Sequence, residues 1–140
     1  MKIPPRTFSV LVAIWIWTLG LHAQLLVVAN PEIKADSISR SELRNVFTGA
    51  TFNLKDGTRV KPVLLKEGAT HTKFVTDELG TSETALLIDW RQRVFSGQAT
   101  MPKTLGSEAE MVTYVAQTQG AVGYISEATP HDGVKVLAVR

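Results

Sequence analysis

The residues most able to do chemistry lie where an apolar segment, residues 59–65, runs into a small-residue loop that opens a predicted helix. This loop and the first helical turn carry a lysine, two threonines and a histidine among small residues: Lys66, Gly68, Ala69, Thr70, His71 and Thr72. The first backbone N–H groups of a helix have no partner within the helix, and the helix dipole is positive at that end. The sequence therefore predicts a site for a small anion at this junction.

Each side chain of this loop also has an ordinary structural interpretation. Lys66 can supply positive charge to an anion, but a lysine at the end of a strand is more often only solvated. Thr70 can donate its hydroxyl to an oxyanion, or it can cap the helix. His71 and Thr72 lie in the first turn, where an imidazole could donate to an anion or respond to pH. An exposed first-turn histidine without such a role is the commoner case.

Two more predicted helix starts offer further donors. Ser39 and Ser41 begin one helix, and Ser107 begins another after a glycine. Ser39 is followed three residues later by Glu42, which is the spacing of a capping box, and Ser107 suits an ordinary N-cap. We name Ser39 and Ser107 as candidate ligand-binding residues, with helix capping as the simpler account.

The sequence contains no catalytic constellation. It has no cysteine, which excludes a disulfide framework, a thiolate metal site and a cysteine nucleophile. His71 and His131 are not spaced with carboxylates in the way that metal ligands are. Neither a Gly-x-Ser-x-Gly elbow nor a Gly-x-x-x-x-Gly-Lys-Ser/Thr loop occurs. We expect a protein that is not an enzyme and that uses no metal or cofactor.

The first 23 residues have the pattern of an export signal. Lys2 and Arg6 precede an apolar run over residues 8–21, and a small residue, Ala23, follows it. The run is shorter than the roughly 20 apolar residues that a membrane span needs. We therefore expect cleavage after Ala23 and a periplasmic location, with a retained anchor as the alternative. Without the two leader charges, 13 of the 15 basic residues remain against 13 acidic ones, which gives no electrostatic reason to expect nucleic acid.

The remaining residues, 24–140, are predicted to form one α/β domain. Apolar runs indicate strands, and apolar positions three and four apart indicate helices. The predicted strands are residues 25–30, 58–65, 120–125 and 134–139, and the predicted helices are residues 39–48, 71–79, 84–95 and 107–118. The first strand is apolar throughout and is expected at the centre of the sheet, and Asp56-Gly57 is expected in a hairpin-like turn. This order predicts a three-layer α/β sandwich with a mixed sheet.

Several landmarks follow one another along this domain. They are the helix ending Phe47-Thr48-Gly49, the loop Gly68-Ala69-Thr70 before Phe74, Trp90 with Phe95-Ser96-Gly97, and the late segment Gly120-Ala121-Val122-Gly123-Tyr124. Together they resemble the periplasmic-binding-protein-like family, in particular short relatives of one lobe of the phosphate-binding component of ABC importers. The resemblance covers nearly all of residues 24–140.

In that family oxyanions bind at helix N-termini in a cleft between two lobes, so the resemblance implies a single lobe of the type 2 periplasmic-binding-protein fold. The family loop typically reads Ser-Gly-Thr, with an arginine shortly before it. Here Thr70 is kept, Gly68 replaces the serine, and the arginine position falls near Leu64. The family pattern places four aromatic residues in or near the core: Trp90, Phe95, Tyr114 and Tyr124.

Two functions follow from this reasoning. In the first, a periplasmic solute-binding-like protein holds phosphate or a related small oxyanion through backbone N–H and hydroxyl groups, in connection with ABC-type phosphate uptake. In the second, the lobe has lost its ligand along with the serine and the arginine. It then contacts a membrane transporter, another periplasmic protein or a second copy of itself. Because a single lobe provides one wall of a cleft, any binding by the monomer is expected to be weak.

Overall fold

The computed structural model describes residues 24–140, and the predicted leader, residues 1–23, lies outside the described residues. Six strands of this part form one mixed sheet in the order β2-β6-β1-β5-β3-β4. They are β1 Leu25–Ala29, β2 Ser37–Ile38, β3 Lys61–Leu65, β4 Lys103–Leu105, β5 Ala121–Ser126 and β6 Lys135–Val139. Strand β1 pairs antiparallel with β5 and β6, whereas β3 runs parallel to β5 and β4. The prediction of a central first strand is therefore confirmed.

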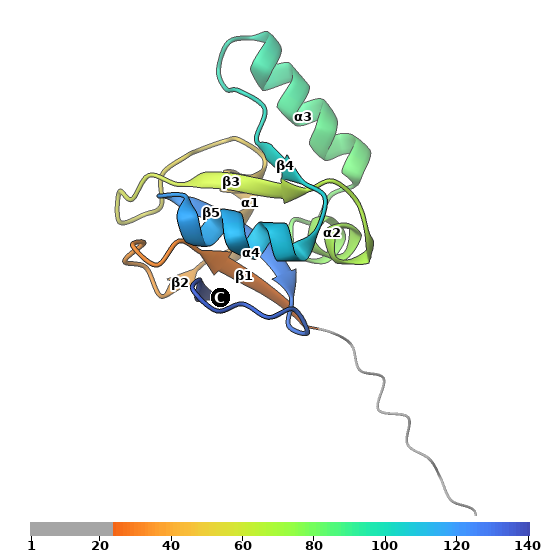
Figure 1. The fold of residues 1–140 in the computed structure, drawn as a ribbon. Helices are drawn as coiled ribbons and strands as arrows, with labels where there is room; N and C mark the ends of the chain where they lie inside the picture. Colours follow the sequence, from red (N-terminus) through yellow and green to blue (C-terminus); the bar gives the residue numbers. More distant parts are fainter. Residues whose placement is uncertain (1–23) are drawn as a thin grey trace, which may run out of the picture.

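Helices cover both faces of the sheet (Figure 1). They are α1 Arg40–Phe47, α2 Ala69–Lys73, α3 Glu83–Phe95 and α4 Glu108–Gln117, with a π-helical segment, η1 Phe74–Glu78, directly after α2. Helix α4 lies across one face and α1 behind the other, while α3 projects away beyond β4 (Figure 1). No helix among residues 24–140 is both long enough and apolar enough to cross a membrane. The predicted three-layer α/β sandwich with a mixed sheet is confirmed.

Strand β5 shows how the two faces are packed, because its side chains alternate between them. Tyr124 lies on the α1 side, where its ring stacks on Phe74 with centroids 3.8 Å apart and meets Phe47 edge-on at 5.8 Å. Gly123 lies on the α4 side, and a Cβ there would collide with the side chain of Met111. The absence of a side chain at Gly123 therefore lets α4 pack directly on β5.

Two strands lie outside the sequence-based prediction. Strand β2 has two residues and β4 has three, which is too few to show a periodicity. The helix predicted at residues 71–79 begins earlier, at Ala69, and continues as a π-helix from Phe74. The hairpin-like turn is confirmed, because the Leu54 N–H donates to the Thr58 carbonyl at 2.9 Å.

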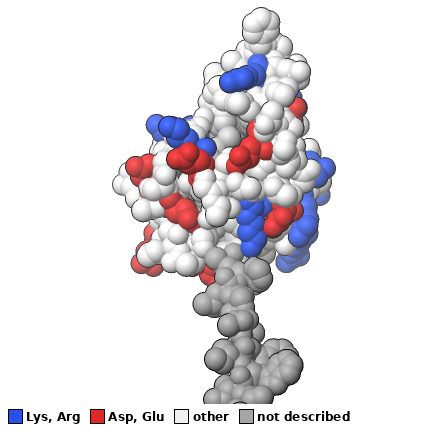
Figure 2. Space-filling view, turned by 90° about the vertical axis from the view of Figure 1, so that its right-hand side faces the viewer, with Lys and Arg blue, Asp and Glu red and all other residues white. Residues whose placement is uncertain are grey.

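The prediction that four aromatic residues lie in or near the core is wrong for Phe95. Trp90 is 1% exposed, and its indole N–H donates to the Phe47 carbonyl at 2.9 Å, which anchors α3. Tyr124 is buried and Tyr114 is half-buried. Phe95 follows Trp90 by five residues, which turns it to the far side of the helix, and it is 96% exposed. Helix α3 thus ends on an exposed ring, in a projecting part of the molecule that is mostly uncharged in Figure 2.

Candidate functional site at the start of α2

The predicted loop lies at the carboxyl end of β3, which the core holds in place. Val63, Leu64 and Leu65 are buried. The chain then turns through Gly68, whose φ of 110° is a conformation that favours glycine. A Cβ at Gly68 would meet no atom within 4 Å. The loop is therefore set firmly at one end and is open to an approaching ligand at Gly68.

The start of α2 has backbone donors without partners in the described part of the chain. The first helical hydrogen bond runs from the Thr72 N–H to the Gly68 carbonyl at 3.0 Å. The N–H groups of Ala69, Thr70 and His71 donate to no group of residues 24–140, and no side chain caps this helix. Adjacent free N–H groups at a helix start form the arrangement that binds anions.

The other three α-helices of the described chain are capped by serine side chains. Ser39 accepts from the Glu42 N–H at 3.1 Å, and the Glu42 carboxylate accepts from the Ser39 N–H at 3.3 Å, which completes the predicted capping box. The side chain of Ser82 accepts from a backbone N–H of α3, and the side chain of Ser107 accepts from a backbone N–H of α4, each at 3.1 Å. Ser39 follows β2, which is four strands from β3 and so roughly 19 Å away at the usual strand spacing. The structure does not bring Ser39 together with the α2 loop.

A carboxylate from α4 already accepts a hydrogen bond from the hydroxyl group of Thr70. Thr70 Oγ1 donates to Glu108 Oε2 at 3.2 Å. The other oxygen of Glu108 accepts from the Ser126 N–H and from Thr129 Oγ1, the latter at 3.1 Å. This carboxylate joins the starts of α2 and α4 to the end of β5. An anion at the Thr70 hydroxyl would meet a second negative charge, which opposes binding there.

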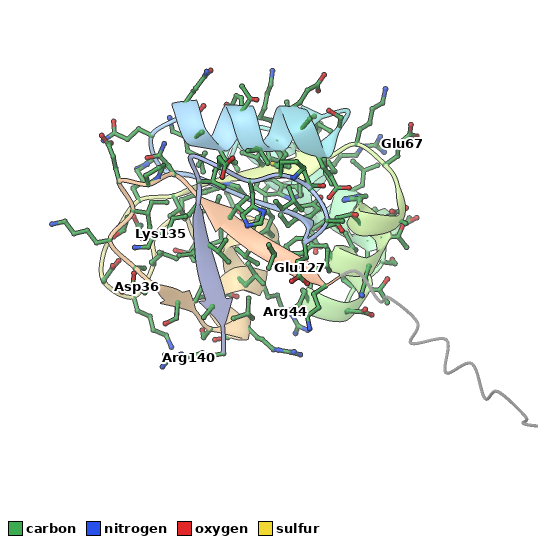
Figure 3. The ribbon with its side chains drawn as sticks, turned by 60° about the horizontal axis from the view of Figure 1, so that its bottom comes forward. Asp36, Arg44, Glu67, Glu127, Lys135 and Arg140 are labelled. Atoms are coloured by element: carbon green, nitrogen blue, oxygen red, sulfur yellow. The ribbon has the colours of Figure 1, made fainter. Side chains whose placement is uncertain are left out.

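Of the other polar side chains of the loop, Thr72 is hydrogen-bonded to a carboxylate and Lys66 is exposed to solvent. Thr72 Oγ1 donates to Glu83 Oε1 at 2.9 Å. Lys66 is exposed and its ammonium has no ion-pair partner within residues 24–140. Its neighbour Glu67 points outward at the margin of the molecule (Figure 3). Lys66 is thus a cation of this loop that an incoming anion could pair with.

His71 is buried, in contrast to the exposed position that is common for a first-turn histidine. It is 8% exposed, and its Nδ1 lies 2.6 Å from the Tyr124 hydroxyl. That hydroxyl oxygen accepts from the Leu65 N–H at 2.8 Å, so its proton is directed to Nδ1. His71 then carries its own proton on Nε2, 3.7 Å from Glu83 Oε1. Burial lowers the pKa of His71, and the nearby Glu83 carboxylate partly opposes this shift, so the ring is neutral near pH 7.

Three residues that complete this region escape the sequence analysis of the loop: Glu83, Glu108 and Tyr124. Glu108 directly follows the N-cap Ser107, where an acidic residue is common, so nothing marks it as a partner of Thr70. Tyr124 does carry a signal, since a buried tyrosine needs a partner for its hydroxyl. Burial raises the pKa of Tyr124 far above its ordinary value, which keeps the hydroxyl protonated as a donor to His71.

Comparisons with known proteins bear on the fold. Neither protein-family profiles nor curated proteins match this sequence. Among solved structures, an ABC-type phosphate transport receptor from Vibrio cholerae matches with a TM-score of 0.60 and 20% identity, over 82% of this chain and 45% of that one. A putative phosphate ABC transporter substrate-binding protein from Clostridium perfringens, solved with bound phosphate, matches with a TM-score of 0.62 and 14% identity. The match covers 82% of this chain and 44% of that one. PstS from Borrelia burgdorferi matches with a TM-score of 0.62 and 16% identity, over 83% of this chain and 47% of that one.

Residues 24–140 therefore have the fold of one periplasmic-binding-protein-like lobe, which confirms the resemblance seen in the sequence. More particularly, the lobe is similar to part of the substrate-binding proteins of phosphate ABC transporters. The chain spans less than half the length of the structures it matches.

Proposed function

We propose that this protein is a periplasmic, non-enzymatic solute-binding-like protein that holds a small oxyanion such as phosphate at the start of α2, in connection with ABC-type uptake. The observation that supports the proposal is the uncapped helix start, where the N–H groups of Ala69, Thr70 and His71 have no partner among residues 24–140. On the same loop, Lys66 adds an exposed cation that forms no ion pair with any residue the structure describes. The solved structures that share this fold include one with bound phosphate.

Binding at this loop is expected to be weak. The hydroxyls of Thr70 and Thr72 already donate to carboxylates of the chain, and the neutral ring of His71 adds no positive charge. Backbone N–H groups and one exposed lysine therefore do most of the binding. We expect a dissociation constant for phosphate on the order of 1 mM for the lobe alone, which corresponds to about 4 kcal/mol.

A second candidate function is that of a protein-interaction module, and the surface of α3 favours it. Five large apolar side chains on α3 and the loop after it are exposed: Leu87, Ile88, Val94, Phe95 and Met101. Single exposed apolar residues are ordinary, but a group of them on a projecting element is typical of an interaction surface. In this candidate the partner is a membrane transporter, another periplasmic protein or a second copy of the chain.

The oxyanion proposal can be tested by removing one backbone donor from the start of α2. Ala69→Pro deletes the Ala69 N–H at a position where proline is well accepted, and Ala69→Ser is the matched control that keeps this donor. In a thermal-shift titration, phosphate should raise the melting temperature of the wild type and of Ala69→Ser. The rise should be much smaller in Ala69→Pro.

Two results would count against the oxyanion site. One is that phosphate, sulfate and molybdate all leave the melting temperature of the wild type unchanged. The other is that Ala69→Pro responds to phosphate as strongly as Ala69→Ser. Either result leaves the interaction module as the better account of the lobe.

A further inference from the structure

A groove beside the amino-terminal half of β3 has a composition unlike that of the α2 loop. It has a volume of about 380 Å³ and is lined by the start of β3, the start of β4 and the loop between α3 and β4. Pockets that bind small molecules commonly have volumes upward of roughly 300 Å³. The groove includes Lys61 at the beginning of β3, whereas α2 follows the last residue of that strand, Leu65. The two regions are therefore separate.

Aromatic rings form part of the groove wall. Phe52 and Trp90 lie together, with ring centroids 6.3 Å apart and planes at 42°, and Tyr114 lines the groove from α4. Trp90 is buried and its indole N–H already donates to the Phe47 carbonyl, so its ring supports Phe52 and offers a ligand no donor. A wall of this kind favours a flat apolar group, because aromatic rings pack well when offset or edge-on.

Three cationic side chains also line this groove: Arg59, Lys61 and Lys103. All three are exposed, and none forms an ion pair within residues 24–140. The Lys103 ammonium lies 5.9 Å from the centre of the Tyr114 ring. Among the described residues, no aspartate or glutamate lines the groove. Such a local excess of positive charge in a concave surface attracts anions.

We propose that this groove binds a small organic anion with a flat apolar body, such as an aromatic carboxylate. The carboxylate pairs with Arg59 and Lys103, since a guanidinium or an ammonium forms strong charge-assisted hydrogen bonds with it. The ring of the ligand lies against Phe52 and Tyr114, which are the partly exposed aromatic residues of the groove. Phosphate would leave this aromatic wall uncovered. The proposal goes beyond the oxyanion function of the α2 loop and does not depend on it.

Calorimetric titration of the purified protein with three small probes tests the class of ligand. Benzoate and benzylammonium share one ring and carry opposite charges, and phthalate adds a second carboxylate to benzoate. We expect phthalate to bind with a dissociation constant on the order of 1 mM or below and more tightly than benzoate. Benzylammonium should not bind, and added salt should weaken the binding of phthalate.

Two matched variants locate the binding. Lys103→Gln removes a cation from the groove and should weaken phthalate binding by at least about fivefold. Lys66→Gln removes an exposed cation from the α2 loop and should leave phthalate binding unchanged. Both positions are exposed, so neither change endangers folding.

Any one of three results would overturn the proposal. The first is that no aromatic acid binds at about 10 mM. The second is that benzylammonium binds as tightly as benzoate, which would make the groove an apolar site without charge preference. The third is that Lys103→Gln leaves phthalate binding intact or weakens it no more than Lys66→Gln does.

Discussion

Replacing Tyr124 with phenylalanine removes a single hydroxyl that joins two elements below the α2 loop. This hydroxyl accepts from the Leu65 N–H at 2.8 Å and lies 2.6 Å from His71 Nδ1, to which it donates. All three residues are buried, so water does not readily replace the lost partner. A buried polar group left unpaired costs about 1–3 kcal/mol, so two such groups, with some relaxation of the histidine ring, should lower the free energy of unfolding by about 2–4 kcal/mol.

Urea unfolding followed by tryptophan fluorescence measures this loss. The matched control is Tyr114→Phe, because Tyr114 is half-buried and its hydroxyl has no hydrogen-bond partner in the part of the chain that the structure describes. The control should change the free energy of unfolding by less than about 0.5 kcal/mol. Tyr124→Phe keeps the ring that stacks on Phe74, so a larger loss can be assigned to the hydroxyl. Equal stability of the two variants would show that the hydrogen bonds of the Tyr124 hydroxyl do not stabilise the fold.

The contact between the Tyr124 hydroxyl and His71 also predicts how stability depends on pH. Burial lowers the pKa of His71 below its ordinary value of 6.5, so between these two pKa values the unfolded chain binds more protons than the native chain. The contribution of His71 is therefore complete above about pH 6.5 and is lost as the pH falls, with a slope of at most about 1.4 kcal/mol per pH unit. In Tyr124→Phe the neutral ring loses its donor, its pKa rises, and the slope becomes smaller. An unchanged slope would contradict the assigned proton positions.

Two further predictions concern packing and surface. Gly123→Ala should lower the free energy of unfolding by about 1–3 kcal/mol, because the new Cβ collides with Met111. The control Gly106→Ala, whose Cβ would meet only Glu110 Oε2 at 3.8 Å, should not destabilise the protein, and a similar loss in both variants would disprove the collision. Phe95→Ser should change the free energy of unfolding by less than about 0.5 kcal/mol, because the ring is 96% exposed. If the exposed face of α3 is an interface between copies, sedimentation should show weaker self-association in Phe95→Ser, and unchanged self-association would exclude Phe95 from it.

Most of the fold could be predicted because its signals are local. The apolar run of β1 and the capping box of Ser39 and Glu42 each specify an element without help from distant residues. Strands β2 and β4 could not be predicted, because they are so short that pairing with β6 and β3 is what defines them. Phe95 was misplaced by the family pattern, whereas the helical period counted from Trp90 turns it to solvent.

The candidate site could be predicted only in outline. Gly68 before a helix marks the start of α2 in the sequence, and the free N–H groups follow from that local pattern. Which side chains are free to bind depends on remote residues. Glu108, which accepts from the Thr70 hydroxyl, is 38 residues from Thr70 in the sequence. Tyr124, which is hydrogen-bonded to His71, is 53 residues from it. No spacing rule connects such positions before the sheet and α4 bring them together.

An NMR titration can show whether the backbone N–H groups at the start of α2 bind an oxyanion. Phosphate would be added to the ¹⁵N-labelled protein while the amide signals are followed one by one. We expect saturable shifts of the amide signals of Ala69, Thr70 and His71, with a dissociation constant on the order of 1 mM. If these three amide signals do not move, or if Lys103 in the groove shows larger shifts, the start of α2 is not the oxyanion site.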